Sequence, residues 1–385
     1  MTRLRGTLGS VALPLVLPGV LLGLVVNGVP DYHRSPLVHA ARFLQDGKEL
    51  YEIACADCHG IDGRGVDLNT VGFDVPVPDF TGCSFSSREP DADWIAVASA
   101  GGPVRAFDEA MPSFGEALSV EQLQSIMDYI RGFCDNNRWP RGELNLPRPL
   151  ITEKAYPEDE AVTTVFVDLD GAGSIINEVV YERRFGTRTQ IELKLPFGFR
   201  ETAPANGEWN AGIGDVTAGL KHVLHSSLER GSILSVGGEI KFPTGNKGNG
   251  FGKGTGVIEP FVTFGQILPG DAFLHLQGII EFPTATSGKT EVVWRAALGR
   301  TLTQAHFGRT WSPMIEILGQ KALGGGSADW DLVPQFQVTL NTRQHVMANF
   351  GVRIPVNGSS QRPRPTQLLV YVLWDWFDGG FFDGW

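Results

Sequence analysis

The sequence predicts an α + β multidomain protein, in which an N-terminal all-α domain precedes an antiparallel β-barrel of about 12 strands. Three observations predict this order. Residues 36–134 hold a cysteine and histidine motif between segments of helical periodicity. Residues 135–160 are rich in proline, and residues 161–385 alternate apolar and polar side chains with period two.

Cys55, Cys58 and His59 form the pattern C-x-x-C-H, which is the attachment signature of a c-type haem. Two thiols three positions apart on a helical turn can each form a thioether with one haem vinyl group, and the next residue offers its imidazole to the iron. A zinc half-site and a redox-active C-x-x-C are alternatives for the same residues. The neighbouring segments favour one covalently bound haem c.

Residues 47–60 resemble the first helix and haem-binding turn of class I cytochromes c. The run Met111-Pro112-Ser113-Phe114 resembles the loop that brings a methionine sulfur to the far side of the iron in that family. The resemblance implies that Cys55 and Cys58 bind the haem, that His59 is the proximal iron ligand and that Met111 is the distal one. Two filled axial positions favour electron transfer over oxygen chemistry.

A closing helix of the same family is expected after Met111. Ser119 and Gln122 form a capping box. An apolar stripe at helical spacing follows, made of Leu123, Ile126, Met127 and Ile130. Met127 is a rival for the distal position, but its place on this stripe favours a core role. The resemblance to class I cytochromes c covers residues 36–134.

The other two cysteines, Cys83 and Cys134, bracket the Met111 loop. In an oxidising compartment they can form a disulfide, which would add on the order of 4 kcal/mol in the chain-entropy model. Two buried free thiols are the alternative.

Residues 1–28 are expected to be a signal peptide. Arg3 and Arg5 precede an apolar run from Val11 to Val26, which holds Pro14 and Pro18. The run is shorter than the ~20 residues of a spanning helix. These features predict export to the periplasm or beyond.

The overall charge of the chain indicates which partners it can bind. The formal net charge is -11, without a basic stripe, which argues against nucleic acid as a partner.

Residues 135–160 hold Pro140, Pro147, Pro149 and Pro157, and are predicted to be an extended linker between the domains.

The β domain at 161–385 shows its alternation most clearly at 190–199, where apolar residues alternate with Gln190, Glu192 and Lys194. Similar runs occupy 234–242, 274–282, 332–340 and 346–354. Each run is close to the ~9 to 11 residues that a tilted strand needs to cross a bilayer. Counting such runs yields eleven candidates from residue 175 onward, and 163–169 supplies a twelfth.

Alternation alone fits both a soluble sandwich and a membrane barrel. Short connections, such as 226–231 and 342–345, alternate with long ones, such as 244–256 and 356–366, as in outer-membrane barrels. The chain ends on Trp385 after an aromatic-rich strand, which resembles the C-terminal signature of outer-membrane proteins. We therefore expect outer-membrane lipid to surround the barrel.

The barrel prediction assigns each side chain of a strand to one face. Leu193, Leu195, Leu274 and Phe336 are expected to face lipid. Glu192, Lys194, Gln277 and Gln337 are expected to face the lumen.

The segments 214–220 and 238–245 resemble MetA-like barrels, a transporter family associated with phenol degradation. The whole chain resembles outer-membrane cytochrome-porin fusions. That resemblance implies electron transfer between a small donor, such as Fe(II), and periplasmic electron carriers, with the cytochrome domain in the periplasm. It favours a non-enzymatic electron-transfer protein and leaves open an oxidoreductase acting on Fe(II) or a small reductant.

Two other functions fit the same sequence. The barrel could be a channel for small or apolar solutes, with the haem domain as a sensor or plug. Alternatively, the chain could be a periplasmic redox protein whose β domain is a soluble binding domain.

Overall fold

The computed structural model describes residues 46–203, 207–286, 288–357 and 364–376. The predicted signal peptide at 1–28 and the C-terminal Trp385 lie outside these residues. Within the described ranges, no helix has both the length and the apolar character to cross a membrane.

The N-terminal part of the described chain is helical, as predicted. Asp46 caps the first helix by accepting a hydrogen bond from Lys48 N, and Ser119 and Gln122 form both bonds of the predicted capping box. The core of this part is formed by Leu50, Tyr51, Phe80, Ile95, Leu123, Ile126, Met127 and Ile130. The α-helices are α2 (Gly47–Ala54), α3 (Ala56–His59), α4 (Cys83–Ser86), α5 (Asp91–Ala100) and α6 (Val120–Arg131).

Short 3₁₀ turns connect these elements. They are η3 (Leu68–Thr70), η4 (Gly102–Arg105) and η5 (Gly142–Leu144), and a further one, η7 (Lys247–Asn249), lies in the β part.

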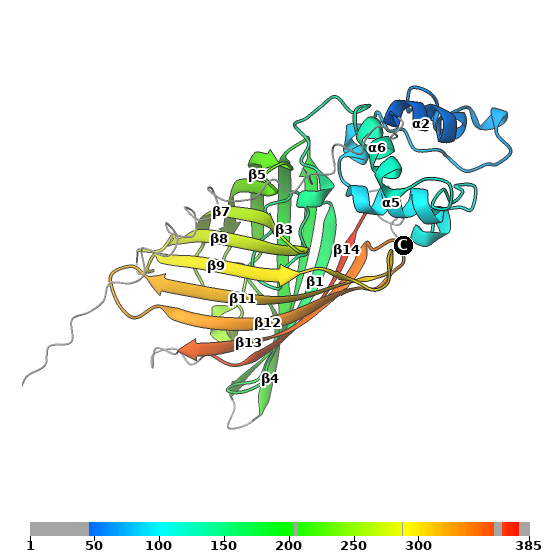
Figure 1. Cartoon of the computed structure of the whole chain (residues 1–385). Coiled ribbons are helices and arrows are strands. Elements are labelled where there is room, and N and C mark those ends of the chain that lie inside the picture. Colours follow the sequence, from blue (N-terminus) through cyan, green and yellow to red (C-terminus); the bar gives the residue numbers. More distant parts are fainter. Residues whose placement is uncertain (1–45, 204–206, 287, 358–363, 377–385) are drawn as a thin grey trace, which may run out of the picture. The chain divides into compact units, whose positions relative to one another are not determined.

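The strands that begin at Glu160 form one antiparallel sheet (Figure 1). Its first seven strands are β1 (Glu160–Asp168), β2 (Ser174–Phe185), β3 (Thr189–Ala203), β4 (Glu208–Ile213), β5 (Thr217–Ser227), β6 (Ser232–Lys241) and β7 (Val257–Leu268). The others are β8 (Ala272–Pro283), β9 (Glu291–Arg300), β10 (Leu302–Thr303), β11 (Thr310–Ala322), β12 (Asp329–Thr339), β13 (Val346–Asn357) and β14 (Gln367–Asp375).

The sheet closes into a barrel because β9 pairs with β11 as well as with β8 (Figure 1). The first and last strands also pair, with Glu160 opposite Asp375. The short β4 continues β5 along β3, and β10 continues β9 along β11. Twelve full strands therefore form the closed barrel, which confirms the predicted fold class and strand number.

Side-chain burial separates the two faces of the barrel as predicted. On β3, the apolar residues 191, 193, 195, 197 and 199 are all exposed, with Leu193 at 49 %, whereas Gln190 and Glu192 are 1 % and 8 % exposed. Lys194, Gln277 and Gln337 also lie on the inner face. Leu274 and Phe336 are half-buried on the outer face.

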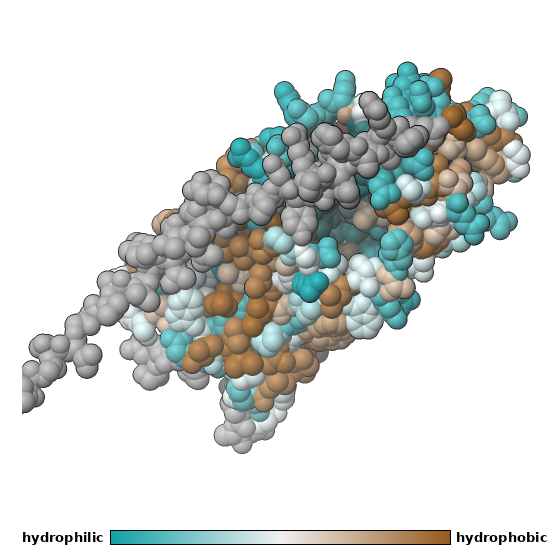
Figure 2. All heavy atoms as spheres, in the orientation of Figure 1, coloured by the Kyte–Doolittle hydropathy of each residue, from teal (hydrophilic) through white to brown (hydrophobic). Residues whose placement is uncertain are grey.

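Apolar side chains form much of the outer surface of the barrel (Figure 2). Exposed examples occur on strands all around it, such as Ile175, Leu220, Ile258, Leu298 and Phe350. An apolar surface of this extent requires a partner other than water, and a barrel with a polar interior is the arrangement found in membranes.

Residues 144–159, which we call the plug, lie inside the barrel. Residues 152–159 are all buried. The main chain of the plug is bonded to inward-facing side chains from opposite parts of the sheet, including Gln335 on β12 and Ser235 on β6. The proline-rich segment predicted as a linker at 135–160 thus connects the helical part to β1 and also fills the lumen.

Candidate haem-binding site

Cys55, Cys58 and His59 come together on a single turn, in which Cys55 separates α2 from α3 and the other two residues belong to α3. The backbone N–H groups of Cys58 and His59 both donate to the carbonyl of Cys55, at 3.2 and 2.9 Å. Gly60 ends the turn with a φ of 73°, a conformation that glycine adopts without steric cost. The buried Tyr51 hydroxyl donates to the Gly60 carbonyl at 2.7 Å and so ties α2 to the end of the motif.

These three side chains line a cavity of about 450 Å³. Its walls are largely apolar and include Phe80, Trp94, Met111, Ile126 and Met127. The thiols of Cys55 and Cys58 are not joined to each other. The site thus offers two free thiols at the edge of an apolar hollow.

The His59 ring is held against Phe80, with ring centroids 4.8 Å apart and planes tilted by 20°. Its Nδ1 atom is buried and has no hydrogen-bond partner among the described residues. Burial lowers the pKa of His59 to about 4. The imidazole is therefore neutral at physiological pH, with a nitrogen lone pair available to a metal.

Burial, and to a smaller extent the neighbouring Cys58, raise the pKa of the Cys55 thiol to about 11. The Cys55 thiol is thus protonated at neutral pH.

Met111 lies in a loop that is fastened to the end of α5. Gly102 N–H donates to the Met111 carbonyl at 2.9 Å, and Phe114 N–H donates to the Ala98 carbonyl at 2.9 Å. A Cβ atom at Gly102 would lie 2.1 Å from the Asp108 carbonyl oxygen, so this close approach requires glycine. The loop holds Met111 at the wall of the cavity that also includes His59.

Met127 borders the same cavity but is anchored differently. It is on the buried stripe of α6, is 4 % exposed and packs in the core beside Leu50 and Ile126. Rotating its sulfur toward a ligand would remove it from this packing, whereas Met111 is only partly buried on a loop.

We predict that Met111→Ala removes the thioether that would bind the haem iron. The reduction potential is expected to fall because a soft thioether ligand is lost, and carbon monoxide is expected to bind to the reduced protein. A redox titration and a carbon monoxide difference spectrum measure the two effects. Met127→Ala is the matched control, and it should lower stability while preserving the haem spectrum. The opposite pattern would assign the ligand to Met127.

Cys83 and Cys134 form a disulfide with a Cα–Cα distance of 5.2 Å. The bond joins the first residue of α4 to the chain just beyond α6, and therefore encloses the segment that carries Met111. It limits how far this segment can move in the unfolded chain, which is the physical basis of its expected stabilisation.

Sequence patterns did not identify all residues of the site. Phe80 and Trp94 contact each other, with centroids 5.3 Å apart, and Phe80 orients His59. Phe80 lies in a loop outside any periodic segment, so no helix or strand pattern predicts its position. Its nearness to the proline-rich residues 76–78 is the only local signal.

Residues 42–130 match the family described as cytochrome C oxidase, cbb3-type, subunit III. The N-terminal part of the chain is therefore a c-type cytochrome domain, and a domain of this kind implies a haem c cofactor. The donor set fits that group, since thiols, a buried neutral imidazole and a thioether border one apolar cavity. No curated protein matches the chain.

The barrel resembles solved outer-membrane proteins. An outer membrane channel (COG4313) from Pseudomonas putida F1 is 14 % identical, with a TM-score of 0.42, over 60 % of this chain and 100 % of that one. The KdgM porin is 9 % identical, with a TM-score of 0.39, over 56 % and 99 %. The NanC porin is 9 % identical, with a TM-score of 0.40, over 56 % and 98 %. At these scores, nothing about function follows from the likeness.

Proposed function

We propose that this protein is an electron-transfer protein of the bacterial outer membrane, in which a β-barrel anchors a monohaem c-type cytochrome domain. The observation that carries the proposal is the single turn that places Cys55, Cys58 and His59 on the wall of an apolar cavity shared with Met111. When bound there, a haem supplies one-electron transfer.

Each side chain of the site has a distinct task in this proposal. Cys55 and Cys58 would hold the haem covalently through thioethers, and His59 and Met111 would supply the ligands of its iron. Phe80 keeps the His59 ring in one orientation. The apolar walls exclude water, and the low polarity around the iron contributes to its reduction potential.

The outer surface of the barrel supports an outer-membrane location. Its exposed apolar side chains would be in contact with lipid, while the buried polar residues line the interior. A soluble β binding domain would instead bury the apolar phase of each strand and expose the polar one. β1 begins at the edge of the barrel where β14 ends, since Glu160 lies opposite Asp375. The cytochrome domain, which precedes β1, is proposed to lie in the periplasm.

The proposed partners are a small electron donor and periplasmic electron carriers. Fe(II) is the donor to test first, because it is a one-electron reductant that matches a single haem.

The test uses the full chain purified in detergent, with its haem in the oxidised form. Fe(II) is added, the visible bands of reduced haem are recorded, and a soluble oxidised monohaem cytochrome c is then added as acceptor. We expect the bands of the reduced protein to appear and then to disappear as the acceptor is reduced. A haem that dithionite reduces but that passes no electron to the acceptor would contradict electron transfer as its function.

A further inference from the structure

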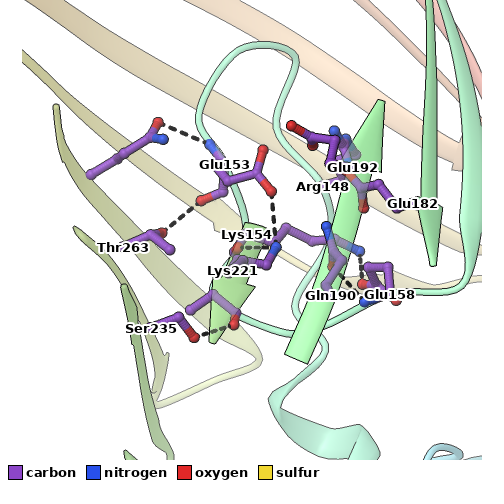
Figure 3. Close-up of polar contacts among 12 residues, drawn as sticks. Arg148, Glu153, Lys154, Glu158, Glu182, Gln190, Glu192, Lys221, Ser235 and Thr263 are labelled. Carbon is purple, nitrogen blue, oxygen red and sulfur yellow. Dashed lines mark hydrogen bonds and ion pairs between the residues drawn. The ribbon is translucent and has the colours of Figure 1, made fainter. Parts of the chain in front are cut away.

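The plug lies across the interior of the barrel. It is bonded to inward-facing side chains around the complete sheet, and Figure 3 shows part of this arrangement, with Glu153 and Lys154 next to Lys221, Thr263 and Ser235. Because the sheet is closed, a segment bonded to every strand must occupy the cross-section of the lumen.

The contacts come from each of the twelve full strands. From β1 to β7 they are made by Glu160, Glu182, Gln190, Lys221, Ser235 and Thr263. From β8 to β14 they are made by Gln277, Arg295, Glu316, Gln335, Asn349 and Tyr371.

Many of these contacts are hydrogen bonds or ion pairs, and apolar side chains of the plug also pack against inward-facing strand residues, as Leu150 does in a cluster with Val333 and Leu369. Thr152 N–H donates to Glu316 at 2.7 Å, Ser235 donates to the Ala155 carbonyl at 2.6 Å, and Tyr371 donates to the Arg148 carbonyl at 2.6 Å. The strands thus satisfy the main-chain groups that an extended, irregular segment would otherwise bury without partners. The inner face of the barrel is fitted to this segment.

Buried ion pairs hold the plug at its centre. Lys221 of β5 lies 2.8 Å from Glu153, and Arg148 lies 2.9 Å from Glu182 of β2. Lys154 also pairs with Glu158 inside the plug. Removing one partner of such a pair leaves a buried charge without compensation, so each pair opposes displacement of the plug.

The same network explains a group of three buried carboxylates. Oxygen atoms of Glu153, Glu182 and Glu192 lie within 4.8 Å of one another. Their cationic partners are Lys221, Arg148 and Lys194 respectively. The group is therefore matched in charge within the protein, and its role is to fasten the plug.

We propose that the plug closes the barrel to solutes, with the Lys221–Glu153 and Arg148–Glu182 pairs as its latch. The barrel is then a sealed anchor and not a diffusion channel. Given the proposed electron-transfer function, on which this consequence rests, a soluble donor reaches the haem site without passing through the lumen.

The test measures ion conductance of the full chain in planar lipid bilayers, with potassium chloride as the permeant salt. This readout needs no haem reduction, so it is independent of the proposed electron transfer. Wild-type protein is expected to insert without stable open-channel current. Lys221→Met is expected to raise the ratio of open to closed channels by on the order of a hundredfold, because Glu153 loses its partner in the lumen.

Lys241→Met is the matched control. Lys241 is a strand lysine that pairs with Glu259 on the neighbouring β7 at 2.9 Å, so its loss removes an ion pair of the barrel and not of the plug. This variant should stay closed. The charge-swapped double variant Glu153→Lys with Lys221→Glu restores an attractive pair and should return toward the closed state.

Folding is checked separately by the difference in gel migration between unboiled and boiled samples. Wild-type protein that shows steady, long-lived channels would overturn the proposal, whatever the variants do. Equal currents from Lys221→Met and Lys241→Met would show that the latch pairs do not hold the plug. An increase in current that is confined to Lys221→Met would support the proposal.

Discussion

The double variant Cys55→Ala/Cys58→Ala is expected to lose all covalently attached haem. Both thioether bonds depend on these thiols, and the apolar cavity alone retains haem only without a covalent bond. Haem staining of a denaturing gel measures the effect, because only covalently bound haem migrates with the polypeptide. Each single variant should stain more weakly than the wild type.

The disulfide supplies a matched control for this experiment. Cys83→Ser/Cys134→Ser also removes two cysteines from the same domain, but these two sulfur atoms are bonded to each other. That variant should be less stable and still stain for haem. Full staining of the Cys55 and Cys58 double variant would show that the motif does not attach the cofactor.

Leu193→Arg is expected to impair assembly of the barrel strongly. Leu193 is 49 % exposed on the outer face of β3, so an arginine there would be directed into hydrocarbon. Near the bilayer midplane this costs roughly 2 to 4 kcal/mol. The fraction of protein that folds in lipid vesicles, read from the gel shift between unboiled and boiled samples, measures the loss.

The control for this variant is Glu229→Arg, which introduces an arginine at an exposed position in the turn between β5 and β6. It makes the larger change in charge but stays in contact with water, so it should fold like the wild type. If Leu193→Arg folds equally well without detergent or lipid, the outer face of the barrel does not contact a membrane.

Local sequence carried most of the information on the helical part. The C-x-x-C-H motif, the capping box at Ser119 and the stripe that includes Met127 all depend on neighbours within one or two turns of helix. Such interactions are encoded within a few residues, so they could be predicted without knowledge of the remaining chain. The position of Phe80 beside His59 could not be predicted in this way, because the contact joins residues that are distant in sequence.

The plug illustrates the opposite case. Its prolines predicted an extended segment between the domains, but they did not predict where that segment would lie. Its main-chain partners, such as Glu316 and Gln335, are more than a hundred residues away along the chain. No local pattern records pairings over such distances.

The sequence by itself determined the haem motif, the order of the two parts and the alternation that assigns Leu193 to the outside and Glu192 to the inside of the barrel. These features depend on spacing and on the period of a helix or strand. Only the tertiary structure decided that β9 closes on β11 and that the plug fills the lumen. Closure brings the inward side chains of all twelve strands around one space, and their hydrogen-bonding groups then require partners, which the extended main chain of residues 144–159 provides.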